Sequence, residues 1–308
     1  MSNYLVIFHK QLGDLVLIEP ALRRLAETGD NTVDLITRSG FLPLNSLMPY
    51  VNFRSKPSVK RYDTLWCFDD RPKSAFFSFL SRARKKRLLV NPGASIQWYH
   101  PKIFPTILAP DLGRSHLSEY YWKHAAEVNR GNFRPPQLGT PPKEWACPIS
   151  SRNYLHVNPT SGWKSKNWSP EKWAMTINRL AEHGIGPVVM TSGTQDWQMS
   201  HCAAICRRLN KPIESFAGKT SIENYLWIIW NAKAVVTVDG SASHIAAAFK
   251  RKCVTLFGHT SATCLHRETT YSKAVVTEKI LGAQSPRLFL LPHEPVIKAV
   301  VKLWEGSP

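Results

Sequence analysis

Residues 234–248 of this chain read AVVTVDGSASHIAAA. The first five residues are uncharged and mostly β-branched, which is typical of a buried strand. The turn Asp239-Gly240-Ser241 follows, and the next residues are rich in alanine, the strongest helix former. A short apolar strand, a tight turn and a helix predict a βα unit, whose turn lies where parallel α/β sheets bind ligands.

The same alternation of strand and helix extends along the chain in both directions. Strand patterns occupy residues 4–8, 33–37, 64–68, 88–91, 154–158, 187–191, 234–239 and 253–258. Helix patterns occupy residues 15–26, 74–84, 171–183, 195–209, 223–231, 242–249 and 294–304. At 308 residues, the pattern predicts an α/β protein with two Rossmann-like, doubly wound parallel-sheet domains.

A stretch rich in proline and turn-forming residues, Arg134 to Pro148, predicts the connection between the domains. We place the boundary after residue 145, so that the domains comprise residues 1–145 and 146–308. The last amphipathic segment could pack back across the first domain.

The formal net charge of +18 and the sequence pI near 9.8 predict a polyanionic partner. Nucleic acid, anionic lipid and a phosphorylated sugar all satisfy this charge. The N-terminus lacks the pattern of a signal peptide, and no run of about 18 apolar residues predicts a membrane span. The six cysteines are dispersed without a C-x-x-C pair, so we expect reduced thiols in a cytosolic protein, although Cys202 and Cys206 lie one helical turn apart and could bind a metal.

The loop after the first strand, residues 9–14, contains a single glycine, Gly13. It therefore lacks both the dinucleotide fingerprint and the phosphate-binding P-loop, which argues against a dehydrogenase. Asp14, at the junction of strand and helix, is either a helix N-cap or a general base.

Two loops of the second half could bind a diphosphate. Residues 160–168 combine small hydroxyl residues and lysines ahead of a helix, which suits an anion site or a solvated basic loop. The turn at residues 239–241 exposes helix N–H groups, and His244, one turn further, could contact a ligand oxygen or satisfy a backbone group.

Together these segments resemble the ADP-heptose:lipopolysaccharide heptosyltransferase family, glycosyltransferase family 9. The resemblance rests on Gly13-Asp14 with Pro20-Ala21-Leu22, Lys166-Asn167-Trp168, Asp239-Gly240-Ser241 with Ser243-His244, and Phe257-Gly258. It implies a GT-B fold with two domains facing a cleft, an acceptor-binding first domain and a nucleotide-sugar-binding second domain. It also implies inverting transfer of a heptose from ADP-heptose to the lipopolysaccharide inner core, onto a Kdo or heptose of a lipid A-linked acceptor, with no cofactor and no metal.

The resemblance also implies roles for individual residues. Asp14 corresponds to the catalytic base, and Lys166 to a catalytic lysine on the donor phosphate. The residues implied in donor binding are Gly13, Thr160, Ser161, Lys166, Asp196, Asp239, Gly240, Ser241 and His244. The family usually reads Asp-Thr-Gly where this chain reads Asp239-Gly240-Ser241, and Asp196 is the candidate acidic residue on the adenosine side.

Positive charge concentrates in the first domain, where we expect the anionic acceptor to bind. The residues predicted to bind it are Lys10, Lys56, Lys60, Arg61 and Arg84. We expect the protein at the cytoplasmic face of the inner membrane, in peripheral contact with anionic lipid. Phe76 and its aromatic neighbours could touch lipid or belong to a helix core face.

Three other functions remain open. The chain could be a GT-B glycosyltransferase that uses another nucleotide sugar, or a nucleotide-sugar epimerase or hydrolase on the same scaffold. It could also be a basic nucleic-acid-binding protein, although no recognised nucleic-acid module is present and we expect no nucleic-acid partner.

Overall fold

The computed structural model describes residues 2–27, 31–90, 95–108, 116–125, 131–147, 149, 153–281 and 287–306. The chain forms two compact units, Met1–Gly139 and Thr140–Pro308. No helix within the described residues is long and apolar enough to cross a membrane.

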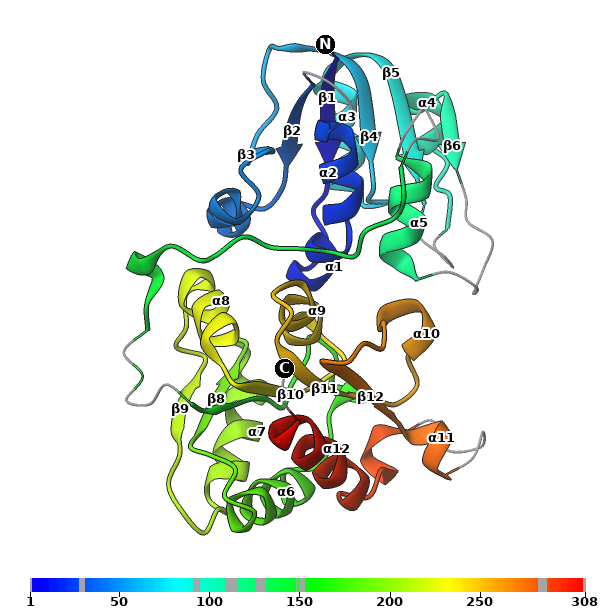
Figure 1. Ribbon diagram of the computed structural model, residues 1–308. Coiled ribbons are helices and arrows are strands. Elements are labelled where there is room, and N and C mark those ends of the chain that lie inside the picture. Colours follow the sequence, from blue (N-terminus) through cyan, green and yellow to red (C-terminus); the bar gives the residue numbers. More distant parts are fainter. Residues whose placement is uncertain are drawn as a thin grey trace. The chain divides into compact units, whose positions relative to one another are not determined.

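The first unit is built on a sheet of six parallel strands in the order β3-β2-β1-β4-β5-β6 (Figure 1). The strands are β1 (Asn3–Ile7), β2 (Thr32–Ile36), β3 (Asn52–Arg54), β4 (Arg61–Cys67), β5 (Arg82–Leu89) and β6 (Thr106–Leu108). The helices are α1 (Leu12–Leu17), α2 (Glu19–Glu27), η1 (Ser39–Leu47), α3 (Pro72–Leu80), α4 (His100–Ile103) and α5 (Leu117–His124). α2 packs against α5, while α3 and α4 pack together on the opposite face, where Leu5, Leu65 and Ala75 join one apolar core.

The second unit repeats this topology. Its parallel strands, in the order β12-β11-β10-β7-β8-β9, are β7 (Leu155–Asn158), β8 (Val188–Ser192), β9 (Glu214–Ala217), β10 (Ala234–Val238), β11 (Lys252–Phe257) and β12 (Ser272–Val276). The helical segments are η2 (Lys143–Trp145), η3 (Lys164–Lys166), α6 (Pro170–Glu182), α7 (Asp196–Cys206), α8 (Ile222–Asn231), α9 (Ser241–Ala248), α10 (Ala262–Leu265), α11 (Thr277–Leu281), η4 (Leu288–Leu290) and α12 (Glu294–Glu305).

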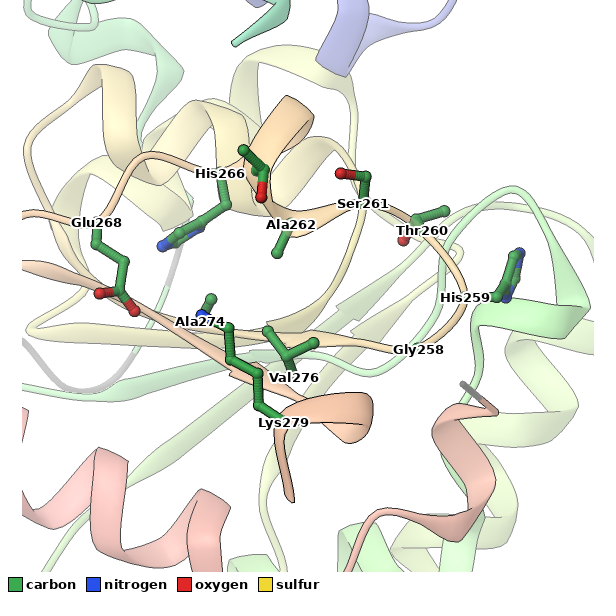
Figure 2. A pocket seen from close by; sticks show the side chains of 11 residues that line it. Gly258, His259, Thr260, Ser261, Ala262, His266, Glu268, Ala274, Val276 and Lys279 are labelled. Atoms are coloured by element: carbon green, nitrogen blue, oxygen red, sulfur yellow. The ribbon is translucent and has the colours of Figure 1, made fainter. Parts of the chain in front are cut away.

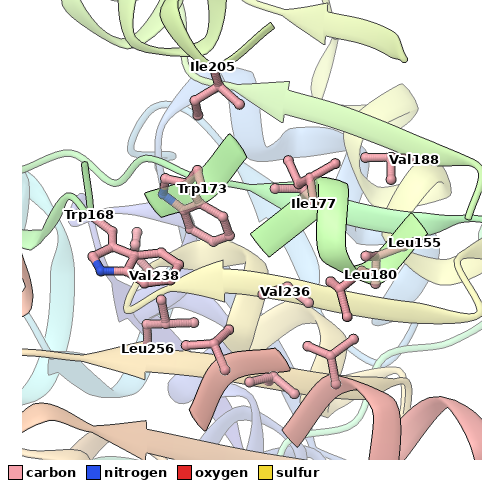
Figure 3. Close-up of a cluster of buried hydrophobic side chains, with 14 of the residues drawn as sticks. Leu155, Trp168, Trp173, Ile177, Leu180, Val188, Ile205, Val236, Val238 and Leu256 are labelled. Carbon is pink, nitrogen blue, oxygen red and sulfur yellow. The ribbon is translucent and has the colours of Figure 1, made fainter. Parts of the chain in front are cut away.

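The larger core of the second unit lies between its sheet and α6, α7 and α12 (Figure 3). Trp168 and Trp173 meet edge to face with ring centroids 5.3 Å apart. The Trp168 indole donates a hydrogen bond of 2.9 Å to the Leu291 carbonyl. This bond ties the segment before α6 to the segment before α12, because a buried indole N–H requires an acceptor.

In each sheet the strand order reverses once. The reversal lies between β1 and β4 in the first unit and between β7 and β10 in the second. Ligands of doubly wound folds bind at the carboxyl ends of the strands beside such a reversal. The topology therefore selects the loops after β1, β4, β7 and β10 as candidate sites.

The prediction of two Rossmann-like parallel-sheet domains is confirmed, and several local expectations are corrected. The helix expected over residues 15–26 is split at Ile18, followed by Pro20, whose missing N–H does not support a continuous helix. The helix expected over residues 74–84 ends at Leu80, and Arg82 begins strand β5, whose backbone pairs with β4.

The start of the second unit lies a few residues before the position expected from the sequence. The units divide between Gly139 and Thr140, before the expected boundary at residue 145. The six intervening residues include η2, where the buried Trp145 accepts a hydrogen bond of 3.1 Å from the Asn224 side chain of α8. α12 packs on β10, β11, β12 and α6 of its own unit.

Candidate functional site

A buried ion pair lies at the switch point of the second unit. Asp239 is the first residue after β10, and the Lys166 ammonium of η3 lies 2.5 Å from its Oδ2. The Thr260 hydroxyl donates to the same oxygen at 2.8 Å. The Asp239 side chain is 3% exposed and that of Lys166 16%, so the ammonium is oriented by the carboxylate yet remains accessible on one side.

The loops after β7 and β10 approach each other closely at Gly240. A Cβ atom at this position would lie 3.3 Å from the Cβ of Ser161. The φ of Gly240 is −176°, an extended conformation open to any residue, so glycine is required for space and not for backbone geometry. The Thr160 hydroxyl, beside Ser161, is buried without a hydrogen-bond partner among the described residues.

A polar network lies beneath these loops and connects strands β7 and β8 to α8 and α9. Asn158 donates to the hydroxyls of Thr191 at 3.2 Å and Tyr225 at 3.1 Å. Tyr225 and Ser241 have their hydroxyls 3.2 Å apart, and the His156 ring nitrogen lies 2.8 Å from Thr191 Oγ1. Burial lowers the pKa of His156 to about 3 and raises that of Tyr225 to about 12, so both are neutral at pH 7. This neutral network fixes Ser241 without adding charge to the site.

The segment after β8 contributes a further contact. The Gln198 side chain of α7 donates to the Ser161 carbonyl at 2.8 Å. Asp196 is the first residue of α7 and is exposed, and the helix begins with a capping box formed by Gln195 and Gln198. The structure thus brings Ser161 into contact with α7, whereas Asp196 lies at its exposed start.

A pocket of about 760 Å³ opens beyond β11 and β12 (Figure 2). Its lining includes Thr260, Ser261, His266, Glu268 and Lys279, which supply hydroxyl, imidazole, carboxylate and ammonium groups. Burial lowers the pKa of His266 to about 4. Thr260 lines the pocket and also donates to Asp239, so it links the pocket wall to the ion pair. The polar groups of the pocket suit a polyhydroxylated ligand.

His244 and Cys202, which the sequence analysis singled out, are both buried in the second unit. His244 lies in the first turn of α9, is 9% exposed and is near enough to contribute to the lowered pKa of His266. Cys202 is buried in the core against α6, and burial raises the pKa of its thiol to about 12. Within the described ranges, no group of three or more His, Cys, Asp or Glu could hold a metal ion.

In the first unit, Asp14 lies at the switch point in the first turn of α1. It occupies the third helical position, and its carboxylate accepts from the Gln11 backbone N–H at 3.2 Å. The N-cap is Gln11, which corrects the reading of Asp14 as the N-cap itself. Gly13 is buried beside it. Asp14 therefore completes a capping box while remaining partly exposed to a ligand.

Two arginines from different strands converge beside Asp14. Arg38 Nε donates to the His9 carbonyl at 2.7 Å, and Arg71 Nη1 donates to the same oxygen at 3.0 Å. Burial and the neighbouring Arg71 lower the pKa of Arg38, while Asp69 and Asp14 act in the opposite direction. Two guanidinium groups on one carbonyl form an anion-binding arrangement that the sequence analysis did not assign. The signal available in the sequence was that each arginine follows a predicted strand.

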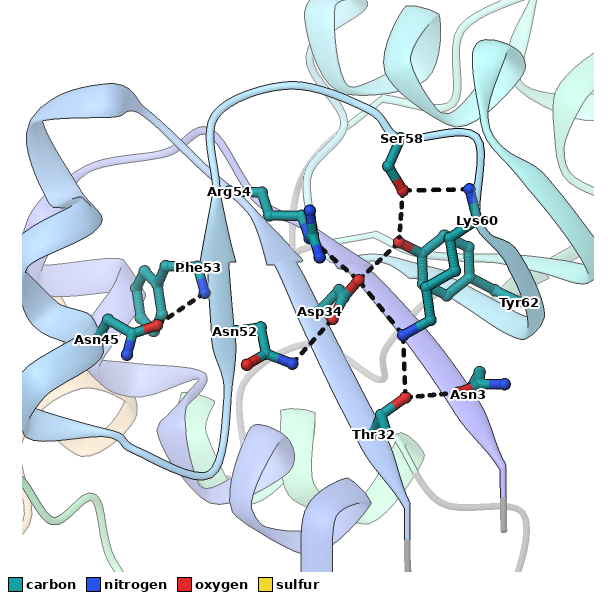
Figure 4. A network of polar contacts seen from close by, with 10 residues as sticks. All are labelled: Asn3, Thr32, Asp34, Asn45, Asn52, Phe53, Arg54, Ser58, Lys60 and Tyr62. Atoms are coloured by element: carbon teal, nitrogen blue, oxygen red, sulfur yellow. Dashed lines mark hydrogen bonds and ion pairs between the residues drawn. The ribbon is translucent and has the colours of Figure 1, made fainter.

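The predicted acceptor residues do not form one cluster. Lys10 pairs with Asp70 at 3.1 Å near the carboxyl end of β1. Lys60 instead neutralises the buried Asp34 of β2, 3.6 Å away, within a network that also contains Tyr62 and Arg54 (Figure 4).

The remaining predicted acceptor residues lie elsewhere in the first unit. Arg61 begins β4, and Arg84 lies in the amino-terminal half of β5, whereas Asp14 follows the carboxyl end of β1. Lys56 is exposed in the segment between β3 and β4. The structure therefore leaves only Lys10, among these five residues, in the loop that carries Asp14.

Two doubly wound parallel sheets, each with polar groups at its switch point, define the GT-B fold, and comparison with solved structures agrees. The structure superposes on E. coli ADP-heptose LPS heptosyltransferase II with a TM-score of 0.81 at 18% identity, covering 98% of each chain. It superposes on E. coli heptosyltransferase WaaC with ADP at a TM-score of 0.75 and 17% identity, covering 98% of this chain and 99% of that one.

Sequence comparison identifies the family. The family model described as "Glycosyltransferase family 9 (heptosyltransferase)" matches residues 119–281. The chain is 30% identical to lipopolysaccharide heptosyltransferase 3 of E. coli over 284 residues, 80% of this chain and 81% of the relative. The strain K12 form of that protein aligns at 30% identity over 161 residues, 49% of this chain and 46% of the relative. The chain belongs to glycosyltransferase family 9 and is a glycosyltransferase.

Proposed function

We propose that this enzyme transfers a heptose from ADP-heptose to the inner core of lipopolysaccharide, onto a Kdo or heptose of a lipid A-linked acceptor. The observation that carries the proposal is the Lys166–Asp239 pair with Thr260 at the second unit's switch point. It offers an oriented cation beside a helix N-terminus, the arrangement that a diphosphate requires. The proposal is supported by relatives named as heptosyltransferases, one of them solved with ADP.

In the proposed reaction, the Asp14 carboxylate removes the proton of an acceptor hydroxyl. The hydroxyl oxygen forms a bond to the anomeric carbon while the bond to the diphosphate breaks on the opposite face, which inverts the configuration. The transition state has oxocarbenium character, so charge develops on the departing ADP. Lys166 and the N–H groups at the start of α9 stabilise that charge, and this scheme assigns no step to a metal ion.

The second unit provides further contacts for the donor. Thr160 and Ser161 supply hydroxyls, and the Gly240 turn leaves space for a phosphate against the backbone. Thr260 marks the beginning of the pocket, whose polar groups are suited to the sugar hydroxyls. We place Asp196 on the adenosine side of the donor, at the start of α7.

The acceptor is proposed to bind the first unit near Asp14. Arg38 and Arg71 together with Lys10 provide the positive charge that an anionic sugar requires. A carboxylate or phosphate group of the acceptor would bind the two guanidinium groups, because arginine binds such groups in a bidentate geometry.

The experiment that tests this function is ADP release from ADP-heptose with a lipid A-linked inner-core acceptor. Asp14→Asn preserves the side-chain shape and removes the base, so we expect kcat to fall by about 10²–10⁴-fold. The matched control is Glu27→Gln, a 52% exposed carboxylate of the same unit, which should leave kcat unchanged. Full turnover by a folded Asp14→Asn enzyme would exclude Asp14 as the base.

Donor identity is tested separately by thermal unfolding with a panel of nucleotide sugars. A ligand that binds the folded state raises Tm by mass action, so ADP-heptose should stabilise the protein more than UDP- or GDP-sugars do. If a UDP-sugar raised Tm more than ADP-heptose did, ADP-heptose would be rejected as the donor.

A further inference from the structure

Helix α3 of the first unit packs Ala75 and Phe77 on the core but exposes its three other large apolar side chains, while its serines are buried. Phe76, Phe79 and Leu80 are 55%, 65% and 50% exposed, whereas Ser74 and Ser78 are fully buried. The exposed residues are spaced three and four positions apart and lie on one face of the helix. A helix of a soluble domain normally has the opposite arrangement, so this face is suited to an apolar environment other than the unit's own core.

A third exposed aromatic residue lies in the segment that leads into α4. Trp98 is 76% exposed and lies two residues before α4, which packs against α3 on the same face of the sheet. The Lys102 ammonium lies 4.7 Å from the centre of the Trp98 ring. We refer to Phe76, Phe79, Leu80 and Trp98 as the α3 patch.

Basic residues are concentrated in the sequence around the α3 patch. Residues 71–108 contain no Asp or Glu and eight basic residues, which are Arg71, Lys73, Arg82, Arg84, Lys85, Lys86, Arg87 and Lys102, although Asp69 and Asp70 directly precede them. Lys73 of α3 and Lys102 of α4 are exposed, whereas Arg82 and Arg84 alternate along β5 with Ala83, which packs on the α3 side of the sheet. Lys86 donates to the Ser78 and Phe79 carbonyls at 2.7 and 3.3 Å, which fixes a cation at the carboxyl end of α3.

From this geometry we infer that the α3 patch docks on an anionic lipid bilayer, with its aromatic and leucine side chains at the boundary between headgroups and acyl chains. The basic residues contact the anionic headgroups, and the combination matches the amphipathic surfaces of peripheral membrane proteins. Nucleic acid requires cations around a polar surface and leaves projecting phenylalanine and leucine side chains without partners. The inference concerns a surface outside the proposed catalytic residues and is independent of the identity of the donor.

The test is co-sedimentation of the full-length protein with vesicles of phosphatidylcholine alone or mixed equally with phosphatidylglycerol. We expect binding only to the anionic vesicles, and weaker binding at high salt. Lys73→Ser with Lys102→Ser should weaken binding about 25-fold, since each basic residue near the surface contributes about fivefold. Phe76→Ser with Phe79→Ser should weaken it about tenfold or more while all the charge is retained.

The matched control is Met175→Ser, which removes a 48% exposed apolar side chain from α6 of the second unit. It should bind vesicles like the unchanged protein, and circular dichroism melts should show that every variant folds. Unchanged vesicle binding by the phenylalanine double variant would overturn the inference. Equal binding to uncharged vesicles, or tighter binding to a single-stranded oligonucleotide that ignores the phenylalanine changes, would overturn it as well.

Discussion

Substitutions in the Lys166–Asp239 ion pair allow its effect on stability to be measured separately from its effect on catalysis. Lys166→Met removes the ammonium but keeps most of the apolar side chain. Asp239, with a side chain 3% exposed, then retains the Thr260 hydroxyl as its hydrogen-bond donor on Oδ2. Leaving a buried charge unpaired costs about 3–5 kcal/mol. Because the lysine side is 16% exposed and water can replace it, we expect the free energy of unfolding to fall by about 1–3 kcal/mol.

The double variant Lys166→Met with Asp239→Asn removes the uncompensated charge. Asparagine has nearly the shape of aspartate and still accepts from Thr260, so the double variant should regain about half or more of the lost stability. Turnover should not recover, since the cation that stabilises the departing diphosphate is still absent. We expect both variants to lose about 10²–10³-fold in kcat.

Urea unfolding followed by circular dichroism measures the change in stability, and ADP release measures the change in kcat. Lys164→Met is the control, because this neighbouring lysine of η3 is exposed and lies 5.8 Å from the Trp197 ring instead of on a carboxylate. Recovery of kcat together with stability in the double variant would refute the reasoning. Unaltered stability of Lys166→Met would refute the importance of the buried pair.

Three further predictions follow from single contacts. Gly240→Ala brings a Cβ 3.3 Å from that of Ser161 and should lower stability by about 1 kcal/mol, and Ser161→Gly should relieve this in urea unfolding. If Gly240→Ala lowered stability equally in the unchanged protein and in the Ser161→Gly variant, this contact would be excluded as the cause. Arg38→Met should raise the acceptor KM about tenfold and leave the donor KM unchanged, which initial rates with each substrate varied will check. Burial holds the pKa of His156 near 3 against 6.5 when exposed, so the unfolded chain binds the extra proton between these values. Stability should therefore fall as the pH drops below 6.5, by about 1.4 kcal/mol per unit from this group, and His156→Asn should flatten that slope in urea titrations at pH 7 and 5.

Much of the fold was predictable from local patterns. The buried strands β7, β8, β10 and β11 were predicted to within two residues at their ends, because uncharged β-branched runs are bounded by turn residues and charges. The edge strands β3, β6, β9 and β12 were missed. Edge strands face solvent on one side, so their sequences carry less of the apolar signal. The basic run after α3 was also misassigned, because its strand conformation depends on pairing with β4 and not on its own residues.

The candidate site was predictable where a motif lies on one loop. Thr160, Ser161 and the turn at residues 239–241 follow central strands, and their position at carboxyl ends was readable from the alternation alone. Arg38 and Thr260 carried no comparable signal. Each follows a strand, but its importance comes from a partner far along the chain, the His9 carbonyl and the Asp239 carboxylate respectively.

By itself, the sequence determined two series of βα units, a strongly basic surface and the family to which the chain belongs. The βα units and the charge depend on periodicity, turn residues and composition within about twenty residues, whereas the family rests on motifs spread from Gly13 to Gly258. Only the tertiary structure decided that Lys166 pairs with Asp239, 73 residues away, and that Lys60 pairs with the buried Asp34. The physical reason is the strand order, because the reversal between β7 and β10 places two distant loops side by side, and no local pattern encodes which strands become neighbours.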